Sequence, residues 1–170
     1  MSSRRLVWRT LLAVSLILSV AGIARGQGVK GHGGQNMAQM KFDLVPGIPA
    51  CSTGSVQSGD PSKGPSILLA KATAACTVPW HWHTPNEHLM IVSGVVRIEM
   101  RDGPTLTLRA GGYALMPSKH VHQFRCTSSC VFYVHSDAAF DIHYVDGQGK
   151  EIPPAEALKA GKNPAPKLIR

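Results

Sequence analysis

Short segments of alternating apolar and polar residues, separated by turns, dominate the chain from Phe42 onward. The clearest is 95–101, in which three apolar residues alternate with three charged ones. Because successive residues of a strand point to opposite faces, this pattern predicts a strand with one buried and one wet face. Further strands are predicted over 66–71, 87–92, 105–109, 113–117, 122–125, 131–134 and 141–145.

Turn-forming residues separate these segments at short intervals. Ser93-Gly94, Asp102-Gly103-Pro104 and Gly111-Gly112 each predict a reversal of the chain. Sequential hairpins must each bury one face, and about eight strands achieve this by closing into a two-sheet roll. We therefore predict an all-β fold, with a helical pattern only at 154–160. A barrel of this size encloses space for one small ligand.

The N-terminal segment, residues 1–26, has the pattern of a secretory signal peptide. Arg4, Arg5 and Arg9 precede an apolar stretch over 11–23, and small residues follow it. That stretch is shorter than the ~20 residues a membrane span needs, so we expect cleavage rather than a stable membrane anchor. The paired arginines resemble a twin-arginine export motif. The predicted location is periplasmic or secreted.

Composition divides the remaining chain into three parts. We predict a glycine-rich flexible linker over 27–40, the β-barrel over 41–149 and a basic C-terminal tail over 150–170. The net charge of +8 comes from the two ends, because residues 27–149 carry nine Lys or Arg against eight Asp or Glu. The predicted barrel therefore has no basic face for nucleic acid.

Four cysteines in an exported protein favour disulfides. Cys126 and Cys130 flank a three-residue loop between two predicted strands, which brings them close enough for a bridge. Cys51 and Cys76 form the second pair by elimination. A zinc site is the alternative, but the spacings lack the paired Cys-x-x-Cys pattern.

His81-Trp82-His83 is the sharpest chemical feature of the sequence. Residues two apart on a strand share a face, so both imidazoles are expected to point inward. Glu87 follows a Thr-Pro-Asn turn and can reach the same point. Two imidazoles and a carboxylate suit a divalent transition metal. The alternative is that one histidine is a core residue and Glu87 is exposed.

Two motifs together resemble the cupin superfamily, over about residues 55–146. His81-x-His83-x-x-x-Glu87 followed by Gly94 resembles its first motif, and Gly111, Pro117 and His122 resemble its second. The resemblance, to small exported single-domain bacterial cupins, implies a jelly-roll barrel with His122 as the fourth metal ligand. It departs from the pattern where glycine is usual, at Ala75 and Lys119, and at Cys126 in place of asparagine.

The remaining candidate residues surround this group. His120 shares a face with His122 and is expected at the mouth of a pocket lined by Leu89, Ile91 and Phe124. His88, next to Glu87 on a strand, should point away from the centre. His135 and His143 match no motif position and are expected to be structural or surface residues.

The resemblance implies one divalent metal ion, which is iron, manganese, nickel or zinc, and a small-molecule ligand. Cupins with these ligands include dioxygenases, decarboxylases, lyases and isomerases, so the fold does not determine the reaction. Three functions remain open: a metal-dependent enzyme such as a dioxygenase, a non-catalytic binder outside the cytoplasm, and a structural role. No catalytic residue is assigned, and a homodimer is expected by analogy alone.

Overall fold

The computed structural model describes residues 33–160. The predicted signal peptide, residues 27–32 of the predicted linker and the last ten residues lie outside this range. Within it, no helix is long and apolar enough to cross a bilayer. The first described element is a short 3-10 helix, Met37–Gln39, inside the segment predicted as a linker.

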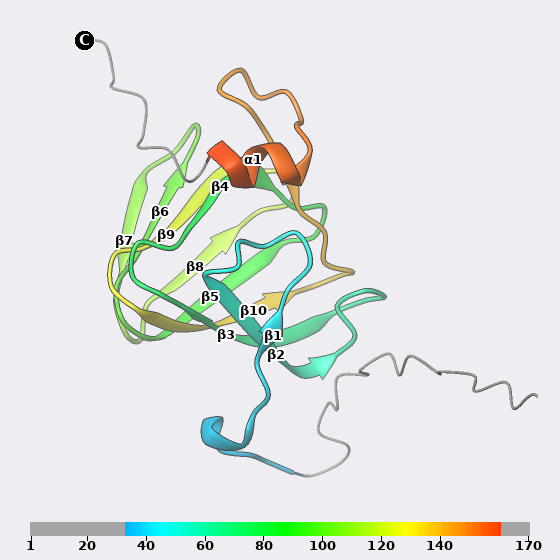
Figure 1. Ribbon diagram of the computed structural model, residues 1–170, viewed down its shortest axis with the longest axis vertical. Helices are drawn as coiled ribbons and strands as arrows, with labels where there is room; N and C mark the ends of the chain where they lie inside the picture. Colours follow the sequence, from blue (N-terminus) through cyan, green and yellow to red (C-terminus); the bar gives the residue numbers. More distant parts are fainter. Residues whose placement is uncertain (1–32, 161–170) are drawn as a thin grey trace, which may run out of the picture.

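Two antiparallel sheets pack face to face (Figure 1). The first has the order β1-β2-β3-β10-β5-β8. Its strands are β1 (Asp43–Leu44), β2 (Ser52–Gly59), β3 (Ser66–Ala72), β10 (Cys130–Ser136), β5 (Glu87–Ser93) and β8 (Tyr113–Met116). The second has the order β11-β4-β9-β6-β7. Its strands are β11 (His143–Tyr144), β4 (Thr77–Trp82), β9 (His122–Cys126), β6 (Val96–Met100) and β7 (Thr105–Leu108).

The predicted all-β roll is therefore confirmed, although within residues 33–160 no strand pairing closes the two sheets into a continuous barrel. Every predicted strand is present with small differences at its ends. The sequence did not reveal β2, because Ser52–Gly59 is rich in serine and glycine and lacks apolar alternation. It becomes a strand because it pairs with β3 along its whole length, from Ser52 opposite Ala72 to Gly59 opposite Ser66.

The core lies between the inner faces of the two sheets. Val96 and Ile98 of β6 are fully buried and Met100 nearly so, as their alternation predicted. The buried Tyr144 closes one side of this core and donates a hydrogen bond to the Gly47 carbonyl (2.7 Å). The folded unit continues past residue 149, because helix α1 (Pro154–Ala160) buries Ala157 against the core. The segment predicted as a basic tail thus contains a packed helix.

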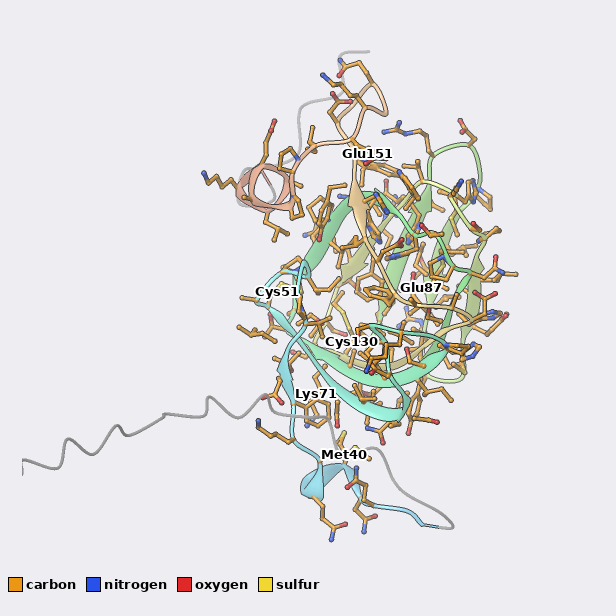
Figure 2. All side chains as sticks on the ribbon, turned by 90° about the vertical axis from the view of Figure 1, so that its right-hand side faces the viewer. Met40, Cys51, Lys71, Glu87, Cys130 and Glu151 are labelled. Atoms are coloured by element: carbon orange, nitrogen blue, oxygen red, sulfur yellow. A yellow bond between two sulfur atoms is a disulfide. The ribbon has the colours of Figure 1, made fainter. Side chains whose placement is uncertain are left out.

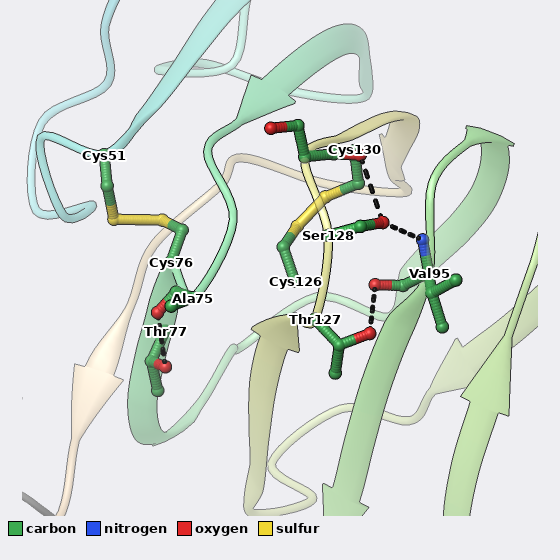
Figure 3. The surroundings of a disulfide bond; sticks show 10 residues. Cys51, Ala75, Cys76, Thr77, Val95, Cys126, Thr127, Ser128 and Cys130 are labelled. Atoms are coloured by element: carbon green, nitrogen blue, oxygen red, sulfur yellow. Dashed lines mark hydrogen bonds between the residues drawn. A yellow bond between two sulfur atoms is a disulfide. The ribbon is translucent and has the colours of Figure 1, made fainter.

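Both predicted disulfides are present, and they lie side by side (Figure 3). The Cα–Cα distances are 5.6 Å for Cys51–Cys76 and 6.1 Å for Cys126–Cys130, and no cysteine is free. The backbone N–H of Cys126 donates to the Cys76 carbonyl (2.9 Å), which ties the two bridges together. Disulfides fit a protein that folds in an oxidising compartment.

Gly94 makes a close approach to this disulfide region. Its φ is 84°, and a Cβ there would collide with the Ser129 carbonyl and with Cys130. Glycine is therefore required at Gly94 both for the left-handed backbone and for space.

Candidate metal centre

A bulge in β4 aims the first histidine inward. Val78 pairs with Phe124 and His81 pairs with His122, so β4 uses one more residue than β9 over this stretch. The extra residue lies at Pro79–Trp80, where a proline is tolerated because the ladder is already interrupted. As a result Val78 and His81, three residues apart, both line the interior.

Four predicted residues converge at the end of β4. His83 follows β4, Glu87 begins β5 and His122 begins β9, and together with His81 all are buried. Each offers a ligand atom within 4.8 Å of the others. Glu87 lies inside the body of the molecule in the side-chain view (Figure 2). The four residues form one compact group of three imidazoles and one carboxylate, which we term the metal group.

Backbone carbonyls set the tautomer of all three imidazoles. The Nδ1 of His81 lies 2.6 Å from the Pro79 carbonyl, and the Nδ1 of His122 lies 2.9 Å from the His120 carbonyl. The Nδ1 of His83 contacts the Asp141 carbonyl. Because a carbonyl only accepts, each Nδ1 carries a proton and donates it, so that in the neutral ring Nε2 keeps the free lone pair. Such hydrogen bonds orient histidine ligands in metal sites.

The Nε2 atoms of His83 and His122 are buried without a hydrogen-bond partner. They lie 3.5 Å and 3.4 Å from the Oε2 of Glu87. An unsatisfied buried polar atom costs free energy of about 1–3 kcal/mol, and two atoms aimed at one carboxylate are unusual in a folded core. A divalent cation at their centre would accept both lone pairs, so the donor set fits a metal ion.

Ionisation of the group also suits a cation. Burial lowers the pKa of His81 well below its usual value, and the neighbouring His122 and His83 lower it further. Burial acts to raise the pKa of Glu87, but the positive charge that His83 and His122 carry when they are protonated outweighs it, so that pKa is lowered. Near neutral pH, His81 is therefore neutral and Glu87 is a carboxylate, which are the states that bind a metal.

A cavity of about 70 Å³ adjoins the group. Of the predicted pocket residues, Leu89 and Phe124 line it, whereas Ile91 packs in the hydrophobic core and His120 does not line it. His120 instead contributes its carbonyl to His122. Sequence reasoning missed the side formed by β2, β3, β10 and the loops near them, because these residues are distant in the chain: Val45, Ile48, Ser52, Leu68, Ala70, Phe132, Val134 and Phe140.

The other histidines of residues 33–160 lie outside the metal group. His88 is on the opposite face of β5 from Glu87, and its Nδ1 lies 2.8 Å from the Tyr113 hydroxyl. His135 lies beside it on β10. His143 stacks on Trp82, with ring centroids 3.9 Å apart.

Both glycine departures from the resemblance adopt left-handed backbone. Ala75 has φ 63° and Lys119 has φ 61°, a region that favours glycine. Lys119 nevertheless keeps its turn, and its N–H donates to the His83 carbonyl (2.8 Å). The predicted register of His122 survives the substitution, because His122 lies opposite His81.

Residues 72–136 match the family model of the cupin domain. This range contains all four residues of the metal group and all of β4 to β10. No curated protein matches the chain.

Solved structures share the fold at low sequence identity. The polyketide cyclase RemF from Streptomyces resistomycificus is 15% identical over 78% of this chain and 94% of its own, with a TM-score of 0.62. An RmlC-like cupin from Shewanella frigidimarina is 13% identical over 62% and 88%, with a TM-score of 0.52. A chain from crystal structures of DMSP lyases is 18% identical with a TM-score of 0.53, and the match covers 63% of each chain.

Proposed function

This chain carries a domain of the cupin superfamily, and we propose that His81, His83, Glu87 and His122 hold one divalent transition metal beside a cavity for a small organic molecule. The observation that carries the proposal is the pair of buried, unpartnered Nε2 atoms facing one carboxylate. Iron, manganese, nickel and zinc all accept imidazole nitrogen.

The cavity favours a ligand with one polar end. Its polar lining consists of Ser52 and three of the four metal-group residues, and the other lining residues are apolar or glycine. A ligand would place its chelating oxygen atoms at the metal group and its apolar part against side chains such as Leu68, Leu89 and Phe132. Ser52, which is buried, offers a hydroxyl for a second hydrogen bond.

We further propose an enzyme of the dioxygenase kind as the first candidate activity. A bound metal supplies Lewis-acid or redox chemistry to a chelated substrate. The protein's own part is to orient the substrate and to keep water away from it, which the apolar walls do. The solved neighbours include a cyclase and lyases by name, so the same fold serves different reactions and does not select among them.

The test compares the four metal-loaded forms with His83→Ala in a screen of small aromatic and aliphatic chelators, with oxygen uptake and ligand binding measured together. Turnover in one metal form that His83→Ala abolishes supports the enzyme. Saturable binding without turnover supports the non-catalytic binder. If no metal form binds or converts any chelator better than His83→Ala does, the proposal that the cavity receives a metal-bound ligand is wrong.

We propose that the protein works outside the cytoplasm after removal of residues 1–26. The two disulfides support this location, because cytosolic thiols are kept reduced. Mass spectrometry of the exported protein should find an N-terminus at Gln27. An intact N-terminus on the mature protein would contradict cleavage.

A further inference from the structure

The turn that joins two members of the metal group contains no metal ligand itself. Thr84, Pro85 and Asn86 connect His83 to Glu87, so their position sets the distance between an imidazole and the carboxylate. Thr84 is exposed, Pro85 is buried and Asn86 is half-buried, so packing fixes the middle of the turn but not its two ends. Hydrogen bonds hold these two ends, most of them from the segment after β10 and the others from Ser118.

Asp141 bonds to the ring of His83 and to the backbone of the next residue, Thr84. Its Oδ1 accepts the N–H of Thr84 (2.7 Å), and its backbone carbonyl accepts the Nδ1–H of His83. One residue therefore fixes the rotation of the His83 ring and the path of the chain after it. His143 holds the other carboxylate oxygen, with its Nε2 3.2 Å from Oδ2.

Asp137 holds the far end of the same turn. Its Oδ1 accepts the N–H of Asn86 (3.0 Å) and its Oδ2 accepts from the Asn86 side-chain amide (2.6 Å). The Asn86 side-chain oxygen in turn accepts the N–H of Ser118 (2.9 Å). Ser118 lies in the connection that leads to His122, so these bonds link the regions carrying three of the four metal-group residues.

We propose that Asp137 and Asp141 are positioning residues that set the affinity and geometry of the metal group by clamping the His83–Glu87 turn. The inference rests on the proposed metal site. Hydrogen bonds from a backbone N–H to a carboxylate oxygen are stronger than hydrogen bonds between two neutral groups. Residues that orient metal ligands typically change metal affinity by ~10–100-fold when they are removed.

The experiment measures Co²⁺ affinity and the visible spectrum of the Co²⁺ form for the full-length protein, Asp141→Ala, Asp137→Ala and Asp141→Asn. Asp146→Ala is the matched control, because its Oδ1 also accepts two backbone N–H groups, from Gln148 (2.9 Å) and Lys150 (3.0 Å), in a turn without a metal ligand. We expect Asp141→Ala and Asp137→Ala to weaken Co²⁺ binding ~10–100-fold and to change the spectrum.

Asp141→Asn keeps an acceptor for Thr84 and should recover most of the affinity, whereas Asp146→Ala should leave affinity and spectrum unchanged. The Asp137 variant tests the positioning role even where Asp141→Ala fails to fold. Wild-type affinity and an unaltered spectrum in both alanine variants would overturn the positioning role of Asp137 and Asp141, and the proposed metal site would stand. A wild-type protein that binds no Co²⁺ would overturn the metal site as well.

Discussion

The two ends of strands β4 and β9 differ in what holds them together. At one end His81 of β4 lies opposite His122 of β9, and both are buried beside Glu87. At the other end Cys76 precedes β4 and Cys126 ends β9, and each is half of a disulfide. The same pair of strands thus has a metal group at one end and covalent cross-links at the other.

The disulfide end satisfies its buried groups within the chain. Cys126 is fully buried, and its backbone N–H and carbonyl are bonded to Cys76 and Ala75. The metal end instead keeps two imidazole nitrogens buried and unpartnered. A cross-linked, well-packed end supplies stability that lets the other end keep two buried, unpartnered nitrogens, which cost free energy of folding.

The largest effect is expected from removing a ligand at the metal end. Tight zinc sites gain about 10–16 kcal/mol from four ligands, which is about 2.5–4 kcal/mol for each ligand, so His122→Ala should weaken metal binding roughly 100–1000-fold. His120→Ala is the control, because its carbonyl, which holds the His122 ring, remains. Equilibrium dialysis of both variants checks this.

His120→Ala should keep the metal and should change ligand binding modestly at most, because His120 does not line the cavity. If His120→Ala empties the site and His122→Ala does not, the assignment of the fourth ligand is wrong.

Removing a disulfide should produce the converse effect, a loss of stability with metal binding preserved. Loop closure predicts a loss of about 3.5 kcal/mol in unfolding free energy for Cys51→Ser/Cys76→Ser and about 2 kcal/mol for Cys126→Ser/Cys130→Ser. The difference follows from sequence separations of 25 and 4 residues. Urea denaturation of the metal-free proteins, with dialysis of their metal-loaded forms, measures both quantities. Simultaneous loss of metal affinity would show that the two ends are not independent.

Gly94→Ala, at the disulfide end, should lower the unfolding free energy by about 2–3 kcal/mol. The causes are backbone strain and a collision of the new Cβ with the Ser129 carbonyl. Gly111→Ala is the matched control. Gly111 has nearly the same φ, 83°, but open space around its Cα. Gly111→Ala should therefore lower the unfolding free energy only by the backbone strain, about 1 kcal/mol. Equal losses in the two variants would remove the steric part of the explanation.

The smallest effect is expected at the two left-handed residues, one at each end. Relief of left-handed strain at Ala75 or Lys119 gains about 1–2 kcal/mol, and the greater freedom of unfolded glycine opposes it by about 0.4–1 kcal/mol. Ala75→Gly and Lys119→Gly should each raise the unfolding free energy by about 0.8 kcal/mol, and by no more than about 1.6 kcal/mol. A fall in thermal midpoint for either variant would contradict this balance.

The sequence predicted what local patterns encode. Val96, Ile98 and Met100 alternate cleanly and are buried as expected. Ser52–Gly59 carries no such pattern, and it is a strand only because β3 lies beside it. The alternation rule placed His81 and His83 on one side, but the bulge that puts His81 beside Val78 depends on pairing with β9.

The metal group could be predicted from the sequence because three of its members lie within seven residues. The residues that support it could not be predicted in this way. Asp141 lies 58 residues from His83, and Phe132 and Phe140 reach the cavity from another sheet or loop. Nothing local marks these positions, because their role arises from contacts that only the folded chain makes.

The most direct test of the central claim is elemental analysis of the protein purified from its exported form, beside His83→Ala. We predict about one transition metal per chain in the wild-type protein and none held tightly by the variant. Absence of a stoichiometric metal, even after reconstitution with iron, manganese, nickel and zinc, would contradict the account.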